Sequence, residues 1–303
     1  MKHERVVTFS GPVSFETTLA PLRRGRRDPC FHVVARGTVW RTSLLSSGPV
    51  TAKIVRVSTN AVRCEVWGGG AEQFLESCPA LLGAHDDHCG FAPSEPTVAA
   101  AYRRFPHLRL GRTGQVLEAL IPAVLEQRVP GADAFRSWRV LVSTFGTPAP
   151  GPGPPGMRVP PAAQIWQEIP SWEFHRANVD PRRAQIVVNC ARRAATLEQL
   201  VNQPVDQARA ALTSLPGVGE WTAAETAQRA FGDADAVSVG DYHLAKMIGR
   251  TLVGQPVTDA VMLELLEPMR PHRYRVVRVL EASGIAVEPR RGPRLPVQDI
   301  RLL

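Results

Sequence analysis

Residues 212–244 read LTSLPGVGEWTAAETAQRAFGDADAVSVGDYHL. Apolar residues recur at helical spacing on both sides of the tetrapeptide Pro216-Gly217-Val218-Gly219, which predicts two amphipathic helices joined by a tight turn. Pro216 fixes its own φ, while Gly217 and Gly219 can adopt positive φ and have no Cβ to keep a ligand away from the backbone amides. Together with the positive N-terminal end of the next helix, the turn is a candidate phosphate site. An ordinary helix-turn-helix corner explains the same residues equally well.

The second informative residue of this stretch is Asp241. It follows a short apolar segment, 236–239, and Gly240, and it precedes apolar residues at helical spacing, namely Leu244, Met247, Ile248 and Leu252. This position predicts the N-cap of a helix. The helix dipole and nearby amides should keep the carboxylate ionised. Asp241 is therefore either a plain helix cap or a catalytic carboxylate.

The combination of these features resembles a known motif. An LPGVG hairpin, a helix and a loop that ends in one Asp resemble the helix-hairpin-helix, Gly/Pro-rich loop and Asp (HhH-GPD) motif of the DNA base-excision glycosylase superfamily. Within it, LPGVGEWTA followed by GDYHLAK is most similar to the bacterial 3-methyladenine DNA glycosylase II branch. The resemblance is stronger over residues 91–284 than before them. It implies a base excision repair hydrolase that flips a damaged base out of duplex DNA and cleaves its N-glycosidic bond.

The resemblance also implies roles for individual residues. Asp241 matches the catalytic Asp, which stabilises the oxocarbenium-like transition state or orients the attacking water. The expected DNA contacts are Gln127, Arg128, Pro216, Gly217, Val218, Gly219 and Glu220, with Arg128 in the place of the family's wedge leucine. The backbone carbonyls of Leu215 and Val218 are expected to bind a monovalent cation, Na⁺ or K⁺.

One position separates the two mechanistic classes of this superfamily. Bifunctional members carry a Lys two residues after the last hairpin glycine, where its amine forms a Schiff base and leads to strand cleavage. Here that residue is Trp221, so we expect base removal without AP-lyase activity. The alternative for Trp221 is a core residue that packs between helices.

The expected base pocket contains Trp221, Tyr242, Glu225 and His272. Glu225 and His272 depart from the family, which has aromatic residues at both places, and His272 is also explained as a histidine at a helix end. The two aromatic rings suit a cationic alkylated purine through cation-π stacking. Two alternatives remain open: a monofunctional glycosylase for uracil, hypoxanthine or oxidised bases, and a non-catalytic DNA-binding or damage-sensing protein.

The composition favours a polyanionic partner, expected to be double-stranded DNA bound by a monomer. The 303 residues include 36 Lys and Arg against 28 Asp and Glu, giving a formal net charge of +8. Only three are Lys, and the excess of Arg suits bidentate phosphate contacts, although GC-rich coding would produce the same bias. The run of Arg23, Arg24, Arg26 and Arg27 is expected to lie in a solvated loop, with DNA contact as the alternative.

The cysteines and the apolar segments bear on cofactors and location. The five cysteines, Cys30, Cys64, Cys78, Cys89 and Cys190, indicate neither a disulfide framework nor a zinc site, and we expect buried reduced thiols. No Cys follows Cys190, so the iron-sulfur cluster of some family members is not expected. No apolar run approaches the length of a membrane span, and no signal-type segment follows the N-terminus. We therefore expect a cytoplasmic, nucleoid-associated protein.

The expected fold class is an α+β N-terminal domain followed by a mainly α-helical glycosylase domain. In residues 1–95, strands are predicted at 5–9, 31–35, 38–44, 51–57 and 62–67, with helices near 15–22 and 74–82. The resembled family begins with a comparable domain of TATA-binding-protein-like form. Residues 96–289 are predicted to form two helical lobes with the active-site cleft between them, and 290–303 a basic extended tail.

Proline residues mark several expected boundaries in the helical part. Asp180 and Pro181 predict the N-cap and first turn of a helix. Pro122 predicts that a helix begins or kinks there. The segment 148–161, PAPGPGPPGMRVPP, predicts an exposed, semi-rigid connection without regular structure. Later helices are expected at 259–266 and 271–282, the second stopped by Gly284.

Overall fold

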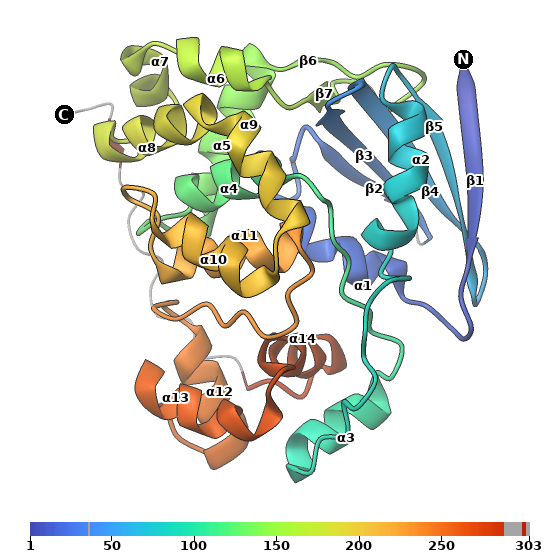
Figure 1. Ribbon diagram of the computed structural model, residues 1–303, viewed down its shortest axis with the longest axis vertical. Helices are drawn as coiled ribbons and strands as arrows, with labels where there is room; N and C mark the ends of the chain where they lie inside the picture. Colours follow the sequence, from blue (N-terminus) through green and yellow to red (C-terminus); the bar gives the residue numbers. More distant parts are fainter. Residues whose placement is uncertain (36, 288–298, 301–303) are drawn as a thin grey trace.

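The computed structural model describes residues 1–35, 37–287 and 299–300, and it places an antiparallel sheet beside a larger helical part (Figure 1). The predicted basic tail, 290–303, lies outside the described residues apart from 299–300. The strands of the sheet are β1 (Lys2–Thr8), β2 (Phe31–Ala35), β3 (Thr38–Leu45), β4 (Gly48–Ser58) and β5 (Ala61–Trp67), in the spatial order β1-β5-β4-β3-β2. The five predicted strands are thus confirmed: β2 has the predicted bounds, β3, β4 and β5 are longer, and β1 begins and ends earlier than predicted.

The sheet forms because its strands alternate between buried and more exposed side chains. In β5, Val62, Cys64 and Val66 are fully buried while their neighbours are half-buried. Helix α1 (Phe15–Leu19), the 3-10 turn η1 (Ala20–Leu22) and helix α2 (Ala71–Leu81) supply the rest of this core. The N-terminal part is therefore an antiparallel sheet covered on one face, as expected for the α+β class.

The helical part is built around α4 (Val116–Leu125), in which every residue except Glu118 is buried. The other helices of this core are α5 (Gly131–Phe145), α6 (Ala163–Glu168), α7 (Ser171–Arg176), α8 (Pro181–Arg192), α9 (Ala194–Glu198), α10 (Val205–Thr213) and α11 (Glu220–Ala230), with η2 (Gln199–Asn202). Pro122 lies inside α4 rather than at its start. The Glu198 carboxylate instead caps that start, accepting from Val116 N and Leu117 N at 2.8 Å each.

A second helical core combines distant parts of the chain. It contains α3 (Pro96–Arg104), α12 (Leu244–Val253), α13 (Asp259–Leu266), η3 (Glu267–Met269) and α14 (Arg273–Ser283). Gly284 ends α14 in the left-handed conformation, with φ of 71°, as its position predicts. Likewise, Asp180 accepts from two amides at the start of α8 and Pro181 occupies the first turn, so that predicted boundary is confirmed.

The segment 148–161 differs from its prediction. It contains a short ladder between β6 (Thr147–Pro148) and β7 (Arg158–Val159), and Met157, Val159 and Pro160 are buried. Arg158 N donates to Pro29 O at 2.9 Å and Thr42 Oγ1 donates to Arg158 O at 2.5 Å. The proline and glycine content excludes a helix, but it does not prevent apolar side chains from packing against the sheet. This segment therefore joins the sheet to the helical part.

Four of the five cysteines are buried, and Cys89 is exposed. The thiols of Cys64 and Cys78 lie 3.2 Å apart, a contact between β5 and α2 that their separation of 14 residues does not reveal. Through the described ranges, no helix combines the length and hydropathy needed to cross a membrane.

Candidate active site

The predicted hairpin joins α10 to α11. Val218 is buried and anchors it, while Pro216, Gly217, Gly219 and Glu220 are exposed. Val218 N donates to Leu215 O at 3.0 Å and closes the turn. Amides at the start of α11 and the exposed turn are therefore available to a ligand from solvent.

The two hairpin glycines differ in their roles. Gly217 has φ of 87°, and a Cβ there would lie 2.4 Å from Cδ1 of Ile186, so both its conformation and its surroundings require glycine. Gly219 has φ of −91°, and a Cβ there would meet open space. Gly217 thus uses the positive φ that glycine permits, and Gly219 does not. Because no described residue beyond the chain neighbours of Gly219 has an atom within 4 Å of the position of that Cβ, this side of Gly219 is open to a ligand.

The loop after α4 is held against the hairpin. Gln127 Nε2 donates to Gly217 O at 3.0 Å and to Thr222 Oγ1 at 2.9 Å. The next residue, Arg128, is exposed and has φ of 55°, a conformation that a non-glycine residue adopts at an energetic cost. The loop therefore presents the Arg128 side chain to solvent directly beside the hairpin.

Asp241 is held by three N–H donors. Its Oδ1 accepts from His243 N at 2.8 Å and from Leu244 N at 2.9 Å, and its Oδ2 accepts from Trp221 Nε1 at 3.2 Å. Helix α12 begins at Leu244 with His243 as its N-cap residue, so the cap predicted at Asp241 lies two residues before the observed one. It still binds the first free amides of the helix, which fixes the orientation of the carboxylate.

Trp221 connects the two helical cores. It is half-buried on α11, whose Ala223 belongs to the first core, and its partner Asp241 leads into α12, whose Leu244 belongs to the second. Part of the indole ring remains accessible beside the carboxylate. Trp221 is thus neither a fully buried packing residue nor a free surface residue.

Glu225 lies one turn after Trp221 on the same face of α11. Its carboxylate pairs with Arg229 Nη1 at 2.7 Å and accepts from Ser238 Oγ at 2.5 Å. Burial alone would raise the pKa of Glu225, but the charge of Arg229 and the Ser238 hydrogen bond lower it below its ordinary value. Because Ser238 belongs to the loop that carries Asp241, this contact also positions that loop.

Tyr242 and His272 have different surroundings. Tyr242 is 71% exposed, and Lys246 Nζ lies 4.0 Å from the centre of its ring. His272 is buried at the start of α14, in edge contact with Phe91, and its Nδ1 accepts from Arg275 Nε at 3.3 Å. Burial and the charge of Arg275 lower the pKa of His272. Tyr242, the residue after Asp241, therefore lies at the surface, and His272 lies within the packing of the second core.

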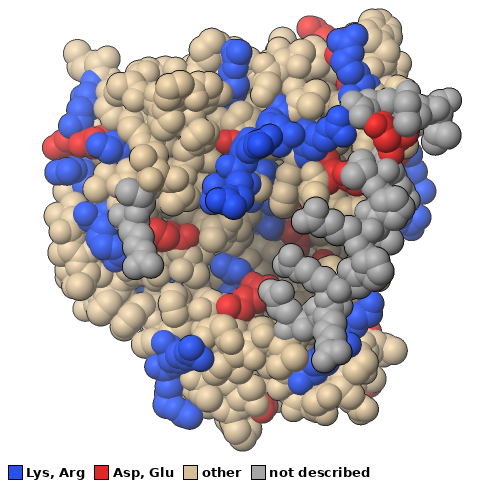
Figure 2. All heavy atoms as spheres, turned by 180° about the vertical axis from the view of Figure 1, so that it is seen from behind, with Lys and Arg blue, Asp and Glu red and all other residues tan. Residues whose placement is uncertain are grey.

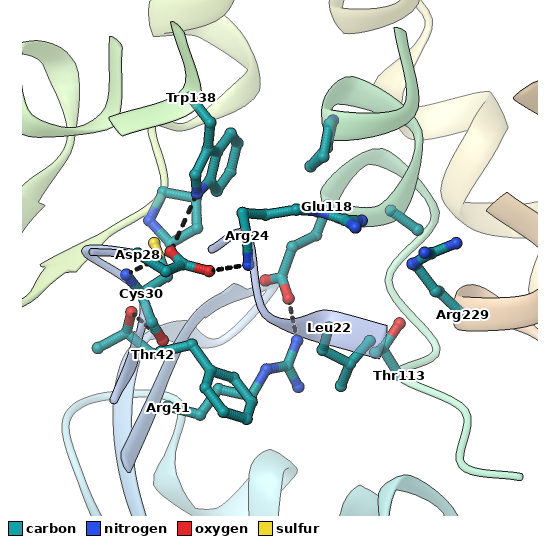
Figure 3. A pocket seen from close by; sticks show the side chains of 14 residues that line it. Leu22, Arg24, Asp28, Cys30, Arg41, Thr42, Thr113, Glu118, Trp138 and Arg229 are labelled. Carbon is teal, nitrogen blue, oxygen red and sulfur yellow. Dashed lines mark hydrogen bonds and ion pairs between the residues drawn. The ribbon is translucent and has the colours of Figure 1, made fainter. Parts of the chain in front are cut away.

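A cavity of about 30 Å³ lies where the sheet meets the helical part. Figure 3 shows its charged lining: the Arg41 side chain pairs with Glu118, and the Arg24 guanidinium extends toward Arg229. This volume is enough for a water molecule and far below the roughly 300 Å³ of a small-molecule site. The cavity thus lies within a layer of polar side chains between the two parts of the molecule and is too small to hold a base.

No protein-family model matches the chain. It is 30% identical over 52% of its length to a Mycobacterium tuberculosis protein described as a probable bifunctional transcriptional activator/DNA repair enzyme AlkA, and it spans 32% of that relative. Its structure matches the 3-methyladenine DNA glycosylase of Archaeoglobus fulgidus with a TM-score of 0.77 at 17% identity, covering 92% of this chain and 98% of the other. The chain has the helix-hairpin-helix DNA glycosylase fold. The resemblance expected from residues 212–244 is confirmed.

Other neighbours with the glycosylase fold differ in chemistry. A Clostridium acetobutylicum 8-oxoguanine glycosylase/lyase matches with a TM-score of 0.70 at 12% identity, over 93% of this chain and 98% of its own. The Schizosaccharomyces pombe 3-methyladenine DNA glycosylase Mag1, bound to abasic DNA, matches with a TM-score of 0.52 at 15% identity, over 64% and 94%. The fold is therefore shared by proteins with and without a lyase in their names, and the residues at the site must distinguish them.

Several residues of this glycosylase fold were not singled out in the sequence. Thr222 fixes Gln127 against the hairpin, Ser238 and Arg229 hold Glu225, and Lys246 lies over Tyr242. The spacing of Glu225 and Arg229, four residues apart on a predicted helix, is a signal that could have indicated their pairing. The other contacts join separate segments, and no local pattern announces them.

Proposed function

We propose that this chain is a monofunctional DNA glycosylase of base excision repair, which hydrolyses the N-glycosidic bond of damaged bases and takes alkylated purines as its substrates. The observation that carries the proposal is the contact between Trp221 and Asp241 beside the exposed hairpin. It brings a fixed carboxylate and an accessible aromatic face to one place, next to a surface suited to DNA backbone.

Asp241 supplies the central charge of the proposed reaction. The bond between the base nitrogen and C1′ breaks, its electron pair leaves with the base, and positive charge develops on the sugar. The fixed carboxylate stabilises this charge or orients the water, whose oxygen then bonds to C1′ while one of its protons passes to the carboxylate or to solvent. His243 N, Leu244 N and Trp221 Nε1 hold the carboxylate in one orientation, so no reorganisation is needed as the charge develops.

The hairpin and the loop after α4 form the proposed DNA-binding surface. Amides of the exposed turn around Gly219 and the N-terminal end of α11 bind a backbone phosphate. Arg128, raised beside the hairpin by its positive φ, fills the space left by the flipped nucleotide. The carbonyls of Leu215 and Val218 would hold Na⁺ or K⁺, since their neutral oxygens suit a monovalent cation, which would offset the charge of the phosphate.

Trp221 supports base removal without strand cleavage. It occupies the place of the Schiff-base lysine of bifunctional enzymes, and its indole nitrogen, which is a hydrogen-bond donor only, binds Asp241 and cannot attack C1′. Lys246 lies nearby in the chain, but its amine contacts the Tyr242 ring. One chain carries the hairpin, Arg128 and Asp241, so a monomer on duplex DNA suffices for the reaction.

The aromatic faces of Trp221 and Tyr242 support a cationic alkylated purine. Such a base has a weakened glycosidic bond and gains from stacking on electron-rich rings. Glu225 contributes less attraction than its charge alone suggests, because Arg229 already neutralises it. The Archaeoglobus fulgidus and Schizosaccharomyces pombe neighbours, both named as 3-methyladenine glycosylases, support the same class of substrate.

A panel of duplexes tests the proposal. Each duplex carries one lesion, namely 3-methyladenine, 7-methylguanine, uracil, hypoxanthine or 8-oxoguanine, and the released base is identified by mass spectrometry. We expect release of the methylated purines by the wild type and not by Asp241→Asn. Release of uracil or 8-oxoguanine alone would contradict the substrate class, and binding without release of any base would support a damage-sensing protein.

A further inference from the structure

The fold gives the arginines of the basic run at residues 23–27 different surroundings. Arg24 is buried, and its guanidinium pairs with Glu126 at 3.2 Å. Arg23 is half-buried and donates to Arg26 O at 3.3 Å. Arg26 and Arg27, in contrast, are exposed. The prediction of a solvated loop therefore holds for Arg26 and Arg27 and is wrong for Arg24.

The loop that presents Arg26 and Arg27 is held by buried hydrogen bonds. The Asp28 carboxylate accepts from Arg24 N at 2.6 Å, from Cys30 N at 2.9 Å and from Trp138 Nε1 at 3.1 Å, contacts that Figure 3 shows beneath the loop. Gly25 adopts φ of 78° against the ring of Phe135 on α5, where an added Cβ would come within 3.0 Å of that ring. The backbone is thus fixed, and binding would order little beyond the two side chains.

Three contacts place this loop next to the proposed DNA-binding surface. The partner of Arg24, Glu126, is followed directly by Gln127, which binds Gly217 O of the hairpin, and then by Arg128. Arg229 Nε donates to Pro21 O at 3.0 Å, and Arg229 shares a face of α11 with Glu225 and Trp221. In Figure 2, Lys and Arg side chains gather across the middle of one face beside a hollow, the pattern expected where a polyanion binds.

We propose that Arg26 and Arg27 bind backbone phosphates of duplex DNA adjacent to those bound by the hairpin, so that the N-terminal part contributes directly to DNA binding. This inference rests on the proposed function, which identifies the partner as duplex DNA. It adds a second contact surface on another part of the chain. Guanidinium groups suit phosphate oxygens through paired N–H donors. The contact carries no base specificity, because phosphates are the same in every sequence.

The test is the affinity of Arg26→Ser/Arg27→Ser for an undamaged duplex over a series of salt concentrations. Each lost phosphate contact should reduce the slope of log K against log salt by about 0.9, hence about 1.8 for the pair. At roughly 0.1 M salt, the affinity should fall at least about tenfold, equally for duplexes of different sequence. Because no base is excised in this assay, its result does not depend on whether the glycosylase activity is correct.

A matched control is Arg103→Ser/Arg104→Ser. These two adjacent arginines are also exposed, and they lie at the end of α3, which Figure 1 places at the lower edge of the molecule, away from α4 and α5. The control removes the same charge and should leave the salt slope within about 0.3 of the wild type. Equal losses in both pairs would show a general charge effect, and an unchanged slope for Arg26→Ser/Arg27→Ser would show no contact. Either result would overturn the inference.

Discussion

Trp221 and Asp241 are separated by 20 residues, yet the indole Nε1 donates to the Asp241 carboxylate across 3.2 Å. The pair joins the helix that follows the hairpin to the loop that enters the second helical core. Its formation therefore depends on how the two cores pack. A change in that packing would move the carboxylate relative to the hairpin, and hence relative to the proposed DNA-binding surface.

Replacing Asp241 with Asn tests its charge. The Asn Oδ1 can accept from the His243 and Leu244 amides, but its NH₂ would then face Trp221 Nε1, a donor against a donor. We expect the free energy of unfolding to fall by only about 1 kcal/mol. The rate of excision should fall more than tenfold, which corresponds to an increase of more than roughly 1.4 kcal/mol in the activation barrier. Thermal melting and single-turnover excision measure the two effects. Excision within tenfold of the wild type would remove Asp241 from the mechanism.

Trp221→Phe keeps an aromatic face and removes the indole donor. The carboxylate then loses one of its three donors. Because one hydrogen bond contributes roughly 1 kcal/mol, we expect the rate of single-turnover excision to fall by about fivefold. In the Asp241→Asn background the same replacement should have little further effect, because the two residues act together. Additive losses in the double variant would show that the hydrogen bond does not contribute.

The hairpin glycines should respond differently to alanine. Gly217→Ala places a Cβ against Ile186 at a positive φ, so we expect a loss of about 2 kcal/mol in the free energy of unfolding. Gly219→Ala adds a methyl group in open space and should change stability by less than roughly 0.5 kcal/mol. Urea unfolding of both variants measures the difference. Equal losses of stability would contradict the conclusion that Gly217 must be glycine and Gly219 need not be.

Gly219→Asp tests the hairpin as a phosphate site, with Gly219→Ala as its control. The new carboxylate would repel a phosphate, while the fold should tolerate the side chain. Affinity for duplex DNA should fall at least about tenfold for all sequences, and binding by the wild type should weaken steeply with salt. An effect that depends on the flanking sequence would be incompatible with a backbone contact.

Glu225→Gln tests the buried pair with Arg229. The variant leaves the Arg229 charge without its partner, so we expect a loss of roughly 3 kcal/mol at pH 7. The pKa of Glu225 is lowered in the fold, so its stabilisation is complete above about pH 4.3, the value in an unfolded chain, and declines as pH falls through the folded value. The difference between variant and wild type should therefore shrink below about pH 4. A constant difference across pH 3 to 7 would show that the charge is not involved.

The proposed lack of lyase chemistry can be tested directly. With Trp221 at the lysine position, the product should be an intact abasic strand that breaks only on treatment with alkali or heat. Borohydride should trap no covalent complex between protein and DNA. A trapped complex that disappears in Lys246→Gln would instead identify that amine as a nucleophile.

The sequence by itself determined the elements and the motif. Strands β2 and β5, the cap at Asp180, the stop at Gly284 and the hairpin all follow from patterns within a few neighbouring residues, where backbone geometry and side-chain alternation leave few options. The loop that carries Asp241 was also predicted from the sequence. The helix after it starts later than predicted, because a carboxylate can reach the capping amides from more than one position before the helix.

Only the tertiary structure decided which side chains meet. Packing of the two helical cores brings Trp221 to Asp241, and contact between the sheet and the helices turns Arg24 inward to Glu126 while leaving Arg26 exposed. It also showed that Gly217, and not Gly219, must be glycine, because Ile186 of α8 occupies the space beside it. These contacts join residues far apart in the chain, and their geometry depends on how whole elements pack, which local periodicity does not specify.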